Sequence, residues 1–385
     1  MTGIKRWIVI IVLFAVAAGA VAGYTAWRRD EQYRTLIASG DRAAADEDSF
    51  GAIEAFSGAI ALRPSSMLAW LKRGEVYLRR GDYRSALRDL REAVQLDPAA
   101  LRPLELLGDT QAALERPARA AALYQTYLDV DDRDARVLYK LAVAHVYEGK
   151  LEAAVTALQA ATRLNDEMPE VHYLLGICLG QQGRRNDAIR ALRRGAALAP
   201  ARLDIRTALA EQYRQAGRHT EEIRELQAVA ALDPQAVARS IAVADAWLRA
   251  NRAEQAASTL IGAIDQFPDD TALLTALGRV WLAVAESSHD KVALGKALTA
   301  LRQSTGRMPT SPGLALLGRA QLLSGDVSGA FRSLQQASAQ LPIEPRTLAD
   351  LAEAASRLGR KAAAREARLR YDALAFTAAG SSSGR

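Results

Sequence analysis

A period of 34 residues runs through most of this sequence and constrains its fold more than any other feature. The segment Met67–Ala100 shows the pattern most completely. It carries Trp70, Gly74, Tyr77, Ala86, Leu90, Ala93 and Pro98 at positions 4, 8, 11, 20, 24, 27 and 32. The frame continues without a gap over seven units, with a small residue at position 8 of each: Gly40, Gly74, Gly108, Ala142, Gly176, Ala210 and Ala244. A fixed period of this length predicts stacked copies of one supersecondary unit.

The recurring residue types indicate that each unit is a pair of helices. Position 20 is Ala in six of the seven units and Glu222 in the sixth unit. Small residues at positions 8 and 20 let two helix axes approach closely. Position 15 is Gly in four units and Asn251 in another, and both residues tolerate the left-handed conformation that ends a helix. Proline at position 32 stops the second helix.

This pattern resembles the tetratricopeptide repeat (TPR). The resemblance implies an all-α fold, a right-handed α-solenoid of about ten helix hairpins over 33–376. It also implies a concave surface lined by the first helix of each unit. Proteins of this family bind other proteins and are not enzymes, so the resemblance implies an interaction role.

The frame breaks in the eighth unit. Gly278 and Trp281 hold positions 8 and 11, but the next matching alanine, Ala297, comes seven residues late. The extra residues lie at about 286–295, and we expect a lengthened connection between two helices. Such an insertion is either a tolerated surface feature or a protrusion specific for a partner. Two further units follow, the last helix caps the solenoid, and 377–385 is predicted to be disordered.

The N-terminus is predicted to anchor the chain in a membrane. Residues 1–6 form a short basic tail, and 7–27 are uncharged and long enough to cross about 30 Å of hydrocarbon. Trp7 at one end and Tyr24 and Trp27 at the other suit the two membrane interfaces. A cleaved signal peptide is the alternative, because Ala18-Gly19-Ala20 matches a cleavage site. Residues 28–32 are a linker.

No residues with recognisable catalytic or metal-binding spacing occur. Nucleotide-binding, hydrolase and zinc motifs are lacking, and the four histidines fall in different repeats. The single cysteine, Cys178, reads as a buried apolar residue. A net charge of +6 is spread along the chain without a basic cluster, which argues against nucleic acid as a partner. We expect no enzyme activity, no cofactor and no metal.

A candidate protein-binding groove follows from the resemblance, in which positions 2, 5, 9, 12 and 13 line the concave surface. Those positions form an apolar patch in the fourth and fifth units, flanked by the second unit. The candidate residues are Arg136, Tyr139, Val143, Val146, Tyr147, Tyr173, Ile177, Leu71 and Leu78. The alternative is that Tyr139 and Tyr173 only pack between helices. Leu71 and Glu75 occupy positions where chaperone-binding members hold a carboxylate clamp, so chaperone tails are not expected as partners.

These features together predict a membrane-anchored adaptor or scaffold that assembles or stabilises a bacterial envelope or membrane complex. The alternative is a permanent structural subunit of a larger membrane complex, held through its transmembrane helix. We expect a single-pass protein of the bacterial inner membrane. The basic residues on both flanks leave its orientation open, and the short basic N-terminal tail favours an extracytoplasmic solenoid.

Overall fold

The fold is entirely helical in the part of the chain that the structure describes. The computed structural model describes the backbone of residues 2–382 and the side chains of residues 7–374 except 9 and 12. The chain divides into two compact units, Met1–Leu198 and Ala199–Arg385. The first unit contains α1 (Thr2–Ala45), α2 (Ser49–Leu62), α3 (Met67–Arg79), α4 (Tyr83–Leu96), α5 (Leu101–Ala113), α6 (Pro117–Leu128), α7 (Ala135–Tyr147), α8 (Leu151–Leu164), α9 (Pro169–Gln181) and α10 (Arg185–Leu198). The second unit contains α11 (Leu203–Gln215), α12 (His219–Leu232), α13 (Val237–Arg249), α14 (Ala253–Gln266), α15 (Thr271–Ser288), α16 (Lys291–Arg307), α17 (Ser311–Ser324), α18 (Val327–Ala337), α19 (Pro345–Arg357) and α20 (Lys361–Ser382).

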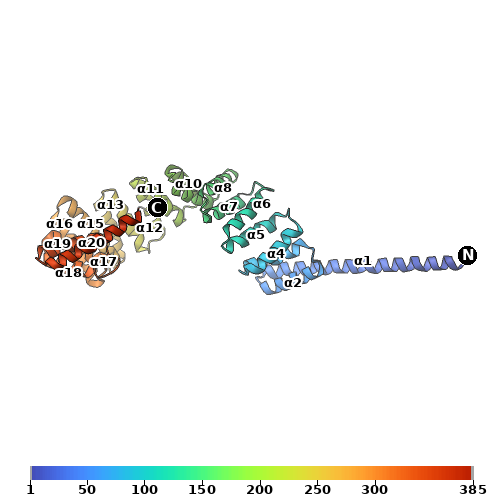
Figure 1. Cartoon of the computed structure of the whole chain (residues 1–385). Coiled ribbons are helices and arrows are strands. Elements are labelled where there is room, and N and C mark those ends of the chain that lie inside the picture. The colour runs from blue at the N-terminus through green and yellow to red at the C-terminus, as the bar shows by residue number, and fades with distance from the viewer. Residues whose placement is uncertain (1, 383–385) are drawn as a thin grey trace. The chain divides into compact units, whose positions relative to one another are not determined.

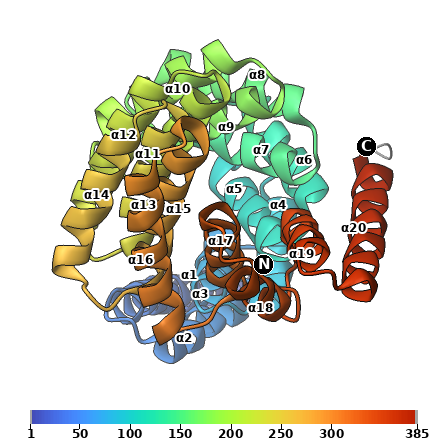
Figure 2. The same ribbon diagram turned by 90° about the vertical axis from the view of Figure 1, so that its left-hand side faces the viewer.

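Each odd-numbered helix packs against the even-numbered helix that follows it, which gives ten hairpins over the described residues. Within each unit every hairpin stacks on the next (Figure 1 and Figure 2). The all-α fold and the number of hairpins predicted from the 34-residue period are therefore confirmed.

Position 15 of the repeat takes the left-handed conformation, as predicted. Gly81 has φ 81° and Asn251 has φ 57°. Glu115 (φ 57°) and Glu47 (φ 61°) adopt the same conformation in the units that lack Gly or Asn there. The turn between the two helices therefore requires this backbone conformation even where the residue type does not favour it.

Close helix crossing explains the small residues at position 8. A Cβ added to Gly176 would lie only 2.4 Å from Cγ of Leu192, a buried residue at position 24 of the same hairpin. The alanines at position 20 are likewise buried, and Ala86 and Ala188 have no exposed surface. Glu222 occupies this position in the sixth hairpin and is 1% exposed, with its carboxylate paired to Arg249 of the next hairpin.

The insertion in the eighth hairpin does not lengthen the connection, so that prediction is wrong. His289 (φ 56°) is the left-handed turn residue of this hairpin. It comes four residues later than the 34-residue period, counted from Asn251, predicts. Only His289 and Asp290 separate α15 from α16. The two helices have 18 and 17 residues, whereas α13 and α14 have 13 and 14. The added residues extend both helices because they contain no proline, and both helices pack against α17 of the next hairpin.

The N-terminal segment forms the first part of α1, which extends without a break through the predicted linker at 28–32 into the first hairpin. In Figure 1 this part of α1 projects from the rest of the first unit as a single helix. The predicted membrane span at 7–27 finds no support in the structure, because among the residues that it describes no helix is both long and apolar enough to cross a bilayer.

Parts of both termini lie outside the described residues. The side chains of the basic tail, residues 1–6, are among them. So are residues 383–385 of the tail predicted to be disordered, while α20 continues to Ser382.

Candidate functional site

An open pocket lies on the inner side of the third and fourth hairpins, formed by α5, the α5–α6 turn, α6 and α7. Its volume is 590 Å³. The pocket is lined by Ala112, Glu115, Pro117, Tyr124, Tyr139, Lys140, Val143, Ala144 and Tyr147. Most of this lining is apolar or aromatic, which suits a side chain of another protein.

The pocket volume of 590 Å³ falls within the range of about 300–1,000 Å³ that is usual for sites in proteins that hold a small ligand or a side chain. Three of the predicted groove residues, Tyr139, Val143 and Tyr147, line it. They are four residues apart on α7 and therefore share one face of that helix. Asp134 caps α7, since its carboxylate accepts hydrogen bonds from the backbone N–H groups of Arg136 (2.9 Å) and Val137 (3.2 Å).

Tyr147 is the most exposed of these aromatic residues, at 79%. Tyr139 and Val143 are half-buried, so exposure along this face of α7 increases from Tyr139 to Tyr147. An aromatic ring left this open on an inner face is a common anchor in protein interfaces.

The other predicted groove residues are not part of this pocket. Leu71 is buried in the core of the second hairpin, and Leu78 packs against the same core. Val146 packs against the core of the third to fifth hairpins. Tyr173 and Ile177 are half-buried on α9, and Arg136 is exposed with its guanidinium 3.5 Å from Asp134. The pocket thus lies between the third and fourth hairpins, whereas the sequence pattern predicted a groove on the fourth and fifth hairpins.

Sequence reasoning missed the contribution of the third hairpin. Tyr124 stands at position 24, where most units have Leu, and its hydroxyl donates a hydrogen bond of 2.7 Å to Asp109. Burial, followed by the charge of Asp109, raises the pKa of Tyr124, so the phenol stays neutral. The aromatic residue at a position usually held by Leu was the available signal.

A network of ion pairs borders the pocket. Lys140 Nζ lies 2.7 Å from Glu105 Oε1 and 2.7 Å from Asp109 Oδ2. Arg102 bridges Glu105 (2.9 Å) and Glu75 (2.7 Å) of the preceding hairpin. Burial disfavours the charged form of Glu105, but the hydrogen bonds and charges of Lys140 and Arg102 outweigh it and lower the pKa of this carboxyl. Glu105 therefore stays ionised at neutral pH, and the network holds three successive hairpins in register.

The second unit contains a smaller pocket of 300 Å³ with a different character. Charged side chains from α11 to α13 line it, among them Glu211, Arg214, Glu222, Asp245 and Arg249. Most of these groups pair with one another, as Arg214 does with Glu211 and Arg249 does with Glu222. The lining of this pocket contains no aromatic side chain, unlike that of the pocket in the first unit.

No group of three or more His, Cys, Asp or Glu side chains among the described residues could hold a metal ion. Cys178 has no exposed surface, and burial raises the pKa of its thiol, which makes it unreactive. His145 and His219 each lie beside a glutamate of their own hairpin, Glu148 and Glu222.

Comparison with protein families agrees with the hairpin geometry. One family described as TPR repeat matches residues 144–183, and two described as tetratricopeptide repeat match residues 67–100 and residues 105–146 and 179–237. This chain is a tetratricopeptide-repeat protein. Repeats of this family generally mediate protein–protein interactions, and the fold is typically a non-enzymatic scaffold. No curated protein matches the sequence.

Several solved structures resemble parts of this tetratricopeptide-repeat protein. A tetratricopeptide repeat protein from Parabacteroides merdae is 15% identical with a TM-score of 0.47, and the match covers 65% of this chain and 99% of that one. MamA from Desulfovibrio magneticus is 17% identical with a TM-score of 0.43 and coverages of 44% and 97%. YrrB, described as a TPR protein with an unusual peptide-binding site, is 19% identical with a TM-score of 0.44 and coverages of 49% and 96%.

Proposed function

We propose that this protein is an adaptor that binds a segment of another protein on the inner side of its third and fourth hairpins. The observation that carries the proposal is the apolar pocket of 590 Å³ beneath the exposed ring of Tyr147. Neither helix propensity nor core packing explains an aromatic residue that is 79% exposed at this place. The ion pairs beside the pocket keep its walls rigid, which lowers the entropy cost of binding.

Substitution of Tyr147 tests this proposal. Tyr147→Ala should weaken partner binding by about 2 kcal/mol, because exposed aromatic anchors carry much of an interface's free energy. The same change should leave the free energy of unfolding almost unchanged, since the ring is 79% exposed. Partners are captured with the full-length protein in mild detergent and identified by quantitative mass spectrometry. Affinity for the identified partner is then measured.

Tyr371→Ala is the matched control, because Tyr371 is an exposed tyrosine on α20, the second helix of the last hairpin. It should leave partner capture unchanged. Equal affinity of the wild-type protein and the Tyr147→Ala variant would rule out this pocket as the binding site.

We further propose that residues 7–27 attach the adaptor to the bacterial inner membrane as a single-pass anchor, with the solenoid on the extracytoplasmic side. Exposed apolar side chains support this proposal, since Phe14 is 77% and Leu13 63% exposed along the projecting part of α1. A contiguous apolar surface of this kind marks an interaction site. Flotation of the full-length protein with vesicles tests the attachment, and a reporter fused after Arg385 tests the orientation. A protein that stays with the soluble fraction would disprove the anchor.

The second candidate is a permanent structural subunit of a membrane complex. Gly19 and Gly23 favour it, because a Cβ added to either would meet no other atom within 4 Å. Small residues four apart allow another helix to approach closely. Gly19→Leu should then release the protein from its complex, whereas Tyr147→Ala should not. Under the adaptor proposal, Tyr147→Ala should release the partner and Gly19→Leu should not.

A further inference from the structure

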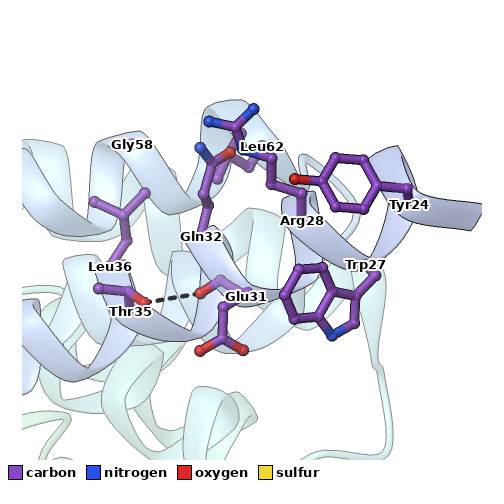
Figure 3. Close-up of a pocket in the computed structure, with 9 residues that line it drawn as sticks. All are labelled: Tyr24, Trp27, Arg28, Glu31, Gln32, Thr35, Leu36, Gly58 and Leu62. Carbon is purple, nitrogen blue, oxygen red and sulfur yellow. Dashed lines mark hydrogen bonds between the residues drawn. The ribbon is translucent and has the colours of Figure 1, made fainter. Parts of the chain in front are cut away.

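A second pocket lies at the point where α1 leaves the first hairpin, and its volume is 750 Å³. One wall is a stripe of α1 side chains spaced by four residues, Tyr24, Arg28, Gln32 and Leu36. The facing wall comes from the end of α2, with Gly58 and Leu62. Figure 3 shows these side chains around the space between the two helices.

The floor of this pocket is open because Gly58 has no side chain, and it is apolar because Leu36 and Leu62 border it. A Cβ added to Gly58 would lie 3.2 Å from Cδ1 of Leu36, so any larger residue would compete with Leu36 for the space. Trp27 and Tyr24 stand at the outer rim with ring centroids 6.0 Å apart, and both are exposed. Aromatic residues with one polar atom favour the interface between water and a bilayer.

Two opposite charges flank the pocket. Arg28 and Glu31 both line it, and neither forms an ion pair with another described residue. By contrast, Asp30 next to them pairs with Arg34 and Arg63. In Figure 3 the guanidinium of Arg28 and the amide of Gln32 lie along one edge of the pocket, and the carboxylate of Glu31 lies along the opposite edge. The pocket thus presents separate cationic and anionic groups with a net charge of zero.

We propose that this pocket binds the head group of a phosphatidylethanolamine molecule in the bilayer. Arg28 and Gln32 donate hydrogen bonds to the phosphate, and Glu31 accepts hydrogen bonds from the primary ammonium. The glycerol region lies on Leu36 and Leu62, and Trp27 lies at the interface. A choline head group cannot donate such hydrogen bonds to Glu31, and an anionic head group without an ammonium leaves Glu31 unpaired.

The proposal rests on the proposed membrane attachment, which brings residues 24–36 to the depth of the head groups. An α-helix rises about 1.5 Å per residue, so Gln32 lies about 8 Å beyond Trp27. This distance matches the depth of the polar interface on one side of a bilayer, which is several ångströms. The pocket and the apolar part of α1 therefore meet the same membrane.

Native mass spectrometry of the full-length protein in non-ionic detergent tests this inference. The probes are phosphatidylethanolamine, phosphatidylcholine and phosphatidylglycerol with identical acyl chains. We expect one phosphatidylethanolamine per chain, retained about tenfold more tightly than phosphatidylcholine, as the loss of a charge-assisted hydrogen bond predicts. Glu31→Gln should remove this preference, and Gly58→Leu should abolish retention by filling the pocket.

Arg34→Gln is the matched control, because Arg34 lies on the same helix but outside the pocket and pairs with Asp30. It should retain the lipid like the wild-type protein. Equal retention of the three lipids, or retention unaffected by Glu31→Gln, would overturn the inference. A protein dimer without lipid would also overturn it, since a second copy would then occupy the pocket. Flotation with vesicles is scored separately, so a chain that floats without lipid preference disproves this site and leaves the anchor intact.

Discussion

At the scale of single residues, the repeat depends on a few positions whose side-chain size is set by a close neighbour. Gly278 in α15 illustrates this, because an added Cβ would lie 2.4 Å from Cγ of Leu301, which has no exposed surface. Gly262 in α14 is also helical, but an added Cβ there would meet no atom within 4 Å. Both Gly278 and Gly262 lie within helices, and only the packing around them distinguishes their roles.

Gly278→Ala should destabilise the second unit by about 1–3 kcal/mol, because overpacking forces the helices apart. Gly262→Ala should instead stabilise it by about 0.5–1 kcal/mol, since Ala is the better helix former. Urea unfolding of both variants measures the two effects. A loss of stability in both variants would contradict this explanation of position 8.

Glu105 provides a prediction on pH. Its pKa in the folded protein is below the ordinary value of 4.5, because the hydrogen bonds and charges of Lys140 and Arg102 outweigh burial. The unfolded state therefore binds a proton before the folded state does as the pH falls. Ionised Glu105 stabilises the fold above pH 4.5, and this contribution is lost as the pH falls from there through the lowered pKa. The difference in unfolding free energy between wild type and Glu105→Gln should be constant near neutral pH and shrink below pH 4.5. A difference that grows on acidification would refute the assignment.

At the scale of helices, ion pairs connect the first helices of successive hairpins at a recurring spacing. Pairs 31 residues apart join position 9 of one hairpin to position 6 of the next. They are Asp41 with Lys72, Asp109 with Lys140, and Arg319 with Asp350. The added turn of α15 extends this system, since Glu286 contacts Arg319 of α17 and Arg346 of α19. The insertion therefore ties three hairpins of the second unit together.

Glu286→Ala should destabilise the second unit by about 1–2 kcal/mol, because it leaves the largely buried Arg319 with only Asp350 as a partner. Glu353→Ala is the matched control. The Glu353–Arg357 pair is about half exposed on both sides and should contribute less than about 1 kcal/mol. Thermal unfolding compares the two variants. Equal effects would show that the insertion has no role in stabilising the hairpins around it.

At the scale of the whole molecule, stability is divided between two compact units, Met1–Leu198 and Ala199–Arg385. In a repeat protein each hairpin mainly contacts its neighbours, so a local defect spreads only through adjacent interfaces. A single unfolding transition for the entire chain is therefore not expected. The candidate binding pocket lies wholly in the first unit and the helix insertion in the second.

Gly278→Ala should thus increase amide hydrogen exchange in α13 to α18 and leave the protection of α3 to α8 unchanged. The physical reason is that α15 packs against α13, α14, α16 and α17, which all belong to its own unit. Hydrogen exchange with mass spectrometry of the full-length variant measures both regions at once. Faster exchange throughout the first unit would show that the two units unfold together.

The sequence alone determined the hairpins and their turns. The 34-residue period located ten helix pairs, and the small residues at positions 8 and 20 predicted their close crossing. These features depend on contacts between residues close in the chain, such as Gly176 with Leu192, so a single unit of sequence records them.

Only the tertiary structure decided which inner-face residues meet. It placed Tyr139, Val143 and Tyr147 in a pocket with Tyr124 and Pro117 of the third hairpin, and it left Tyr173 of the fifth hairpin outside. It also showed that the insertion extends two helices. These outcomes depend on the rotation between successive hairpins and on the side chains that occupy the space between them. A repeating pattern leaves both undetermined, because the same positions recur in every unit while their neighbours differ.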